Sequence, residues 1–136
     1  MSKIITISGS SRFVELMAVV AWMMEKEGNA VFSLNYLPNW YDTGPDSRDH
    51  LAEKEKCSDI LDKVHFKKIS VSDELFVLDW NFYVGESTKQ EIDFALSLNK
   101  PVFYYMSSKY RPMLQDCLEK SLSWLGLKFN DSDMVE

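Results

Sequence analysis

The chain of 136 residues suits one domain, residues 1–136, and its hydrophobic fraction of 46% is high enough for a folded core rather than a disordered chain. The formal net charge of −6, with lysines and arginines scattered along the chain, argues against binding to a nucleic-acid polymer, because such binding needs a basic face. A single nucleotide or nucleoside is not excluded, because it needs only one or two cations and some backbone N–H groups.

The cysteines and the apolar stretches indicate the kind of compartment. Cys57 and Cys117 are far apart and form no Cys-x-x-Cys pair, so we expect free thiols and neither a metal site nor a disulfide framework. The apolar stretch "LMAVVAWMM" is much shorter than a membrane span, and no signal peptide is evident. We therefore expect a cytoplasmic protein that does not contact a membrane.

The first third of the chain predicts a strand, a helix and a second strand. These elements are expected at residues 3–8, 12–27 and 30–36. Ser10 or Ser11 can cap the helix, and Gly28 followed by Asn29 ends it. A strand–helix–strand unit of this kind implies parallel strands.

The rest of the chain continues the alternation of strands and helices. We expect an irregular segment at 37–49, a helix at 50–71 with a break near Asp62 or Ser70, a strand at 74–80, a helix at 88–98, a strand at 102–106, a helix at 111–125 and a loose acidic tail at about 130–136. Such alternation predicts an α/β doubly wound parallel sheet with helices on both faces. Ligands bind such sheets at the carboxyl ends of the strands.

The first candidate loop at a strand end is "SGSSRF". Gly9 allows a sharp turn between strand and helix, and the N–H groups of Ser10, Ser11 and Arg12 are then expected at a helix N-terminus, where an anion can bind. The guanidinium of Arg12 also fits a phosphate. The alternative is that Ser10 only caps the helix and Arg12 is solvated. The loop lacks the G-x-G-x-x-G pattern, so NAD and FAD are not indicated.

The second candidate loop is "GESTKQE". Gly85 frees the backbone, and Ser87 and Thr88 offer hydroxyl and N–H groups to a phosphate at the start of the next helix. The spacings Ser87-x-x-Gln90 and Thr88-x-x-Glu91 also match helix capping boxes.

Glu91 has two interpretations. As the last residue of a capping box, it only closes the start of a helix. As a carboxylate that borders the apolar face of that helix, it can attack the anomeric carbon of a sugar or stabilise an oxocarbenium ion.

Four further residues are candidates for the same site. His65 precedes the third predicted strand and Asp79 ends it, so either can handle a proton or a sugar hydroxyl; a structural histidine and a strand-end cap are the alternatives. Trp40 and Tyr41 lie in the irregular segment and can stack on a nucleobase, or else form an apolar lid or a dimer contact.

Together these residues resemble the nucleoside 2-deoxyribosyltransferase and 2′-deoxynucleoside 5′-phosphate N-hydrolase superfamily. The resemblance runs from "ITISGSSRF" to "KPVFYY" and is carried by the first turn and by "ESTKQEIDFALSLNKPV". More narrowly, the chain is similar to small bacterial and phage proteins of this superfamily.

The resemblance implies a Rossmann-like (flavodoxin-like) fold of four to five strands, a homodimer or larger homo-oligomer, and cleavage of an N-glycosidic bond without a metal or redox cofactor. Glu91 corresponds to the catalytic glutamate of the superfamily, and His65 stands where relatives carry an aspartate. The phosphate-contacting or substrate-contacting positions correspond to Gly9, Ser10, Arg12 and Ser87.

Three functions are thus expected to compete. The first is N-glycosidic cleavage or deoxyribosyl transfer on a nucleotide or nucleoside. The second is a non-catalytic nucleotide-binding or sensing module that uses the same crevice. The third is a structural protein that self-associates through the apolar helix at 13–24, in which Glu15 is the only charged residue.

Overall fold

The computed structural model describes residues 2–35, 37–38, 40–41 and 52–125, with side chains up to residue 120. Its centre is a sheet of four parallel strands in the order β2-β1-β3-β4. The strands are β1 (Ile4–Gly9), β2 (Ala30–Phe32), β3 (Glu74–Leu78) and β4 (Val102–Tyr104). The predicted parallel α/β sheet is therefore confirmed.

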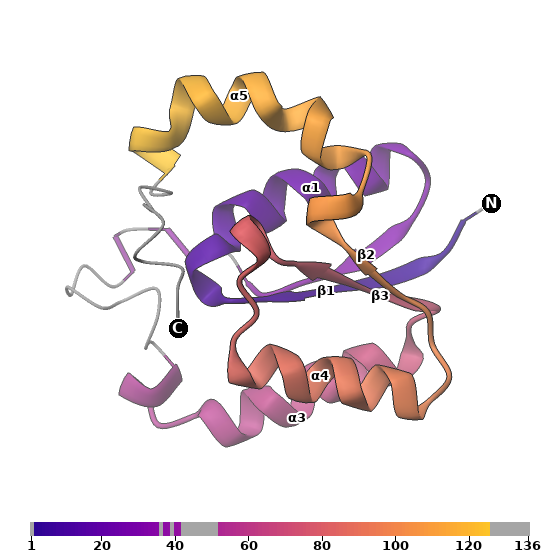
Figure 1. Ribbon diagram of the computed structural model, residues 1–136. Helices are drawn as coiled ribbons and strands as arrows, with labels where there is room; N and C mark the ends of the chain where they lie inside the picture. Colours follow the sequence, from indigo (N-terminus) through magenta and orange to yellow (C-terminus); the bar gives the residue numbers. More distant parts are fainter. Residues whose placement is uncertain (1, 36, 39, 42–51, 126–136) are drawn as a thin grey trace.

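Four helices cover the two faces of the sheet (Figure 1). They are α1 (Val14–Lys26), α3 (Ser58–Val71), α4 (Glu86–Ser97) and α5 (Tyr110–Leu125). The helices α1 and α5 lie on one face, and α3 and α4 lie on the other. Each follows a strand and runs back across the sheet, so the amino ends of these helices gather at the carboxyl edge of the strands.

Several boundaries differ from those expected. β2 and β4 have only three residues each, and β4 passes directly into the 3-10 turn η3 (Tyr105–Ser107). The expected helix at 50–71 is divided, because residues 52–54 form a separate helical turn and α3 begins only at Ser58. The break lies at 55–57, where Lys56 has a φ of 59°, and not near Asp62 or Ser70. The acidic tail lies outside the described residues.

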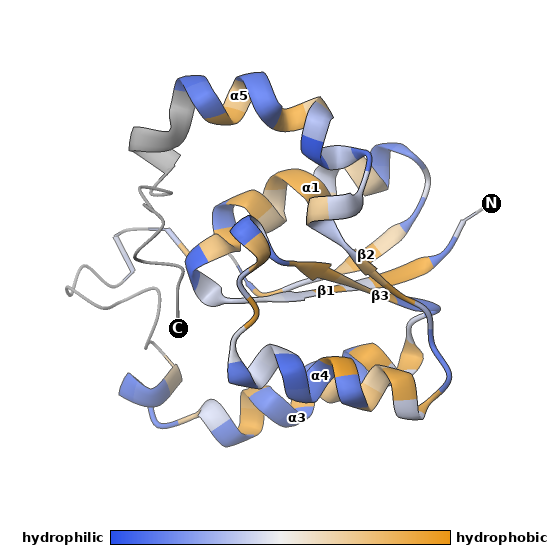
Figure 2. Ribbon diagram, viewed as in Figure 1, coloured by the Kyte–Doolittle hydropathy of each residue, from blue (hydrophilic) through white to orange (hydrophobic). Residues whose placement is uncertain are grey.

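The two faces of the sheet have separate apolar cores. Toward α1 and α5, the strands present Ile5, Ile7, Phe76 and Leu78. Complete burial of one such side chain contributes about 1.5–3 kcal/mol. Figure 2 shows β3 and much of α1 in the hydrophobic colours, whereas part of β1 is pale. The apolar residues of α1 that are buried here are Val14, Leu16, Met17, Val20 and Met24.

The burial of α1 bears on the expected self-association. Most apolar side chains of the segment 13–24 are buried in the core, and its large exposed apolar side chains are Val19 and Trp22.

None of the helices in the part of the chain that the structure describes is long and apolar enough to cross a membrane.

The strand order places a crevice between β1 and β3. The chain leaves β1 through α1 on one face, whereas it leaves β3 through α4 on the other face. The connections therefore diverge at the carboxyl ends of these two strands, which is where ligands bind in folds of this class.

Candidate functional site

A pocket of about 640 Å³ lies at this crevice. That volume is in the range of small-molecule sites. Most of its described lining comes from the turn after β1, the loop after β2, the segment 52–57 with the following α3, and the first turns of α4. The amino ends of three helices therefore border one cavity, which favours negative charge on a ligand or on a side chain within it.

Glu91 lines this pocket and does not cap its helix. α4 begins at Glu86 with Gly85 as the N-cap, and no side chain makes a capping hydrogen bond there. Neither of the two capping boxes that the spacing allowed is formed. The helix also begins two residues before Thr88, the expected first residue, so Glu91 lies in its second turn, and it is one of the residues that line the pocket.

The buried ring of His65 lies beside the Glu91 carboxylate. The Oε1 of Glu91 lies 3.4 Å from the Nε2 of His65, and the Oγ of Ser8 lies 3.0 Å from the same nitrogen. His65 is only 5% exposed. The three residues come from α4, α3 and β1, so the packing of both helices on the sheet determines this arrangement.

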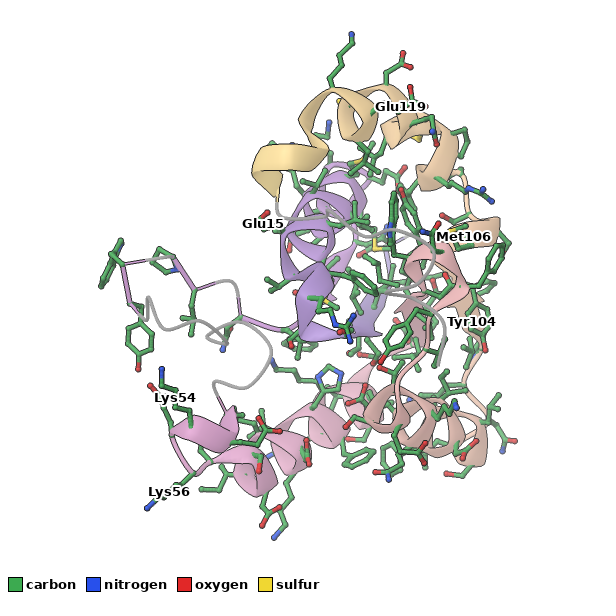
Figure 3. The ribbon with its side chains drawn as sticks, turned by 60° about the vertical axis from the view of Figure 1, so that its left-hand side comes forward. Glu15, Lys54, Lys56, Tyr104, Met106 and Glu119 are labelled. Carbon is green, nitrogen blue, oxygen red and sulfur yellow. The ribbon has the colours of Figure 1, made fainter. Side chains whose placement is uncertain are left out.

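Asp79 lies elsewhere. It follows β3, but its Oδ1 accepts a hydrogen bond of 2.9 Å from the backbone N–H of Met106. Burial raises the pKa of its carboxyl, although the hydrogen bond from Met106 opposes that effect. Asp79 is not among the described residues that line the pocket, and its contact is that of the strand-end cap. In Figure 3, Met106 and Tyr104 lie at the side of the molecule opposite Lys54 and Lys56, which belong to the segment before α3.

The first predicted loop enters the pocket in part. Gly9, Ser10 and Ser11 line it, whereas Arg12 is not among the described lining residues. The Ser10 hydroxyl caps the following turn by accepting from the N–H of Arg12, at 3.2 Å. The Arg12 guanidinium lies over the ring of Tyr83, 5.2 Å from its centroid.

Gly9 is required for a different reason from the one expected. Its backbone does not adopt a positive φ, and Gly28 is the one described glycine that does. A Cβ at Gly9 would instead lie 2.9 Å from the backbone oxygen of Leu78, on the neighbouring strand. The glycine therefore permits close approach of β1 and β3 beneath the pocket rather than a sharp turn.

The second predicted loop lines the pocket with Gly85, Ser87 and Thr88. A tight turn leads into it from β3, in which Asn81 and Phe82 both have positive φ values, 50° and 65°. Such a conformation is unfavourable for an aromatic residue and persists only where the surrounding structure imposes it.

The two candidate aromatic residues are placed differently. Tyr41 lines the pocket, and its hydroxyl donates to the Oε2 of Glu55 at 2.8 Å. Trp40 is 79% exposed and is not among the described lining residues. Residue 39 and the remainder of the irregular segment, residues 42–49, lie outside the described residues.

Sequence reasoning missed several residues of the pocket, among them Asp62, Lys68 and Tyr83, and also missed Ser8 behind it. Asp62 precedes His65 by one helical turn, a spacing that places two side chains on one face and that the sequence did contain. Partial burial raises the pKa of Asp62, and the nearby Glu91 carboxylate adds to the effect.

The described lining is more acidic than basic. Its carboxylates are Glu53, Glu55, Asp62, Glu86 and Glu91, and its basic side chains are His65 and Lys68. The Lys68 ammonium donates to the backbone oxygen of Ser33 at 3.2 Å. Within the described ranges, no group of three or more histidine, cysteine, aspartate or glutamate side chains could hold a metal ion.

Comparisons of the chain with protein-family models, with curated proteins and with solved structures found no match.

Proposed function

We propose that this protein cleaves the N-glycosidic bond of a nucleoside or nucleotide, by hydrolysis or by deoxyribosyl transfer, with Glu91 as the nucleophile. The observation that carries the proposal is the position of Glu91: the residue lines the pocket at the carboxyl edge of the sheet, its carboxylate lies 3.4 Å from a buried histidine, and it does not cap its helix. The resemblance of both loops to the deoxyribosyltransferase superfamily supports the same chemistry.

The reaction would proceed in two steps. The Glu91 carboxylate attacks C1′ of the sugar while the C1′–N bond breaks, and the base takes the electron pair of that bond together with a proton from the His65 imidazolium. Water, or a second base, then attacks C1′ and displaces Glu91. The proton that the incoming group loses returns to His65, so the enzyme regains its starting state.

The other pocket residues have binding roles in this proposal. Ser10, Ser11, Ser87 and Thr88 offer polar groups to the sugar or to a 5′-phosphate, and Tyr41 offers an aromatic face to the base. The acidic excess of the lining favours an uncharged nucleoside, whereas the helix amino ends favour a phosphate. Both classes therefore belong in the test.

The experiment incubates the protein with nucleosides and nucleoside 5′-monophosphates, in ribose and deoxyribose forms, and measures the free base by chromatography. Glu91→Gln is expected to abolish base release while the protein stays folded. Asp93→Asn is the matched control, because Asp93 is exposed on the same helix and is not among the described lining residues. Base release by Glu91→Gln at the wild-type rate would falsify the proposal.

A different outcome would favour the binding module. If members of the panel raise the melting temperature but no base is released, the crevice binds its ligand without chemistry. Addition of a second free base during the assay separates transfer from hydrolysis, because only transfer yields a new nucleoside.

A further inference from the structure

The side of β1 that faces α3 carries two buried hydroxyl groups. Thr6 and Ser8 are both 0% exposed, whereas Ile5 and Ile7 on the other side of the strand belong to the apolar core. A hydroxyl in such a position is unfavourable unless it is hydrogen-bonded. The Oγ1 of Thr6 lies 2.5 Å from the Oγ of Ser72, and Ser8 contacts His65.

Ser8 and Glu91 contact the same ring nitrogen of His65. The Nε2 of His65 has the Ser8 Oγ at 3.0 Å and the Glu91 Oε1 at 3.4 Å. An ionised carboxylate can only accept hydrogen bonds, so an unprotonated Nε2 would direct its lone pair at a negative charge. A serine hydroxyl can accept as well as donate, and therefore satisfies a protonated Nε2 equally well.

We propose that Ser8 is a positioning residue, which holds His65 so that a proton on its Nε2 stays beside the Glu91 carboxylate at the wall of the pocket. The inference rests on the proposed function, because it assigns to Ser8 a part in the same proton transfer. Ser8 does not line the pocket among the described residues, so it acts through His65 and not on the substrate. Without the Ser8 hydroxyl, the ring has one partner fewer at Nε2 and can rotate within its site.

The kinetic test compares Ser8→Ala with Thr6→Val. Each variant removes one buried hydroxyl from the same face of the same strand, but Thr6 contacts Ser72 and not His65. With a substrate that the panel identifies, Ser8→Ala is expected to lower kcat by about 10- to 100-fold with little change in KM. Thr6→Val is expected to retain kcat, and Ser8→Thr, which keeps the hydroxyl, is expected to recover part of the loss.

The spectroscopic test needs no turnover. Long-range proton–nitrogen NMR spectra of ¹⁵N-histidine-labelled protein show which ring nitrogen carries the proton, and the signals of the second histidine are identified with His50→Gln. In the wild-type protein, at a pH where the ring is neutral, the proton of His65 is expected on Nε2. Ser8→Ala is expected to give a mixture of the two forms, and Thr6→Val the wild-type spectrum.

The two tests separate the possible failures. If the neutral ring of His65 in the wild-type protein carries its proton on Nδ1 and not on Nε2, the positioning role is overturned, even if Ser8→Ala does not fold. Unchanged spectra and unchanged kcat in Ser8→Ala overturn it while the proposed function stands. A spectrum that responds to Ser8→Ala in a protein that releases no base supports the positioning of His65 and removes the proposed function.

Discussion

Glu91 and His65 belong to different helices, yet their side chains meet at the pocket with 3.4 Å between Oε1 and Nε2. Both helices run from the carboxyl edge of the sheet toward its amino edge, and they pack on each other over the same face. A carboxylate and an imidazole that are held together in this way can divide the work of nucleophile and acid. The predictions below test this pair and the structure that supports it.

The first prediction concerns the leaving base. His65→Gln is expected to lower base release by about 10²- to 10⁴-fold for ordinary purine or pyrimidine substrates, because the base then leaves without a proton. An N7-methylated purine nucleoside already carries a positive charge on its base and should be cleaved almost as fast by the variant as by the wild type. Rates for the two substrates are compared by chromatography. An equal loss for both would assign His65 a structural role instead.

The second prediction concerns Asp79, which the sequence suggested as catalytic. Asp79→Ala leaves the buried N–H of Met106 without its acceptor, so we expect the free energy of unfolding to fall by about 1–3 kcal/mol. Asp79→Asn keeps an acceptor oxygen and should lose less. Denaturant unfolding of both variants measures the difference. Equal stability of Asp79→Ala and the wild type would contradict the assignment of Asp79 as a strand-end cap.

These two residues illustrate what the sequence can and cannot predict. The alternation of elements and the apolar runs are local features, and they were enough to predict the parallel sheet. The direction of the Asp79 side chain could not be predicted from the sequence. It depends on the irregular backbone after Leu78 and on η3, which supplies the N–H of Met106.

Ser8 was missed for a related reason. The pattern "ITIS" does show polar residues alternating with isoleucines in a strand, which is unusual for a sheet buried on both faces. Which helix covers the polar side, and which of its residues lies opposite Ser8, depends on how α3 packs across the sheet. No local pattern contains that information, so the partner His65 appears only in three dimensions.

The third prediction is the effect of pH on Asp62. Its pKa is raised in the folded protein by partial burial and by the Glu91 carboxylate, so the fold disfavours the charged form. The native state therefore holds its proton to higher pH than the unfolded chain, and stability falls as pH rises from the ordinary value of 3.8 through the raised pKa. Asp62→Asn has no carboxyl group to ionise, so the variant does not lose this stability as the pH rises.

Asp62→Asn is thus expected to melt at a slightly higher temperature than the wild type at pH 7, with the difference shrinking in acid below pH 3.8. The effect should be small, because Asp62 is exposed to solvent. Asp59→Asn, one turn earlier in the same helix, is the control. A lower melting temperature for Asp62→Asn at pH 7 would show that the carboxylate stabilises the fold.

The fourth prediction concerns Glu27, where α1 meets the start of α5. Lys109 lies 2.7 Å from one carboxylate oxygen, and the Tyr110 hydroxyl donates to the other. These hydrogen bonds, from Lys109 first, lower the pKa of Glu27 below 4.5. The stabilisation is therefore fully present above pH 4.5 and is lost as pH falls through the lowered pKa.

Melting curves of Glu27→Gln over a range of pH test whether this stabilisation is lost in acid. The variant is expected to be less stable than the wild type at pH 7 and to approach it in strong acid, where the wild-type carboxyl is protonated. Glu25→Gln, exposed near the end of the same helix, should show no such dependence. A difference that grows in acid would mean that Glu27 is not stabilised by these partners.

The last prediction concerns the buried hydroxyl of Tyr105. Tyr105 is 0% exposed, its ring lies 6.4 Å from that of Trp80, and burial raises its pKa to about 12. Its hydroxyl has no hydrogen-bond partner among the described residues. Tyr105→Phe removes only that oxygen, so we expect equal or greater stability.

Tyr110→Phe is the matched comparison, because it loses the hydrogen bond to Glu27 and should be less stable by about 1 kcal/mol. Unfolding by denaturant ranks the two variants. If Tyr105→Phe were the weaker, its hydroxyl must bond to a group in the remaining segments of the chain or to an ordered water.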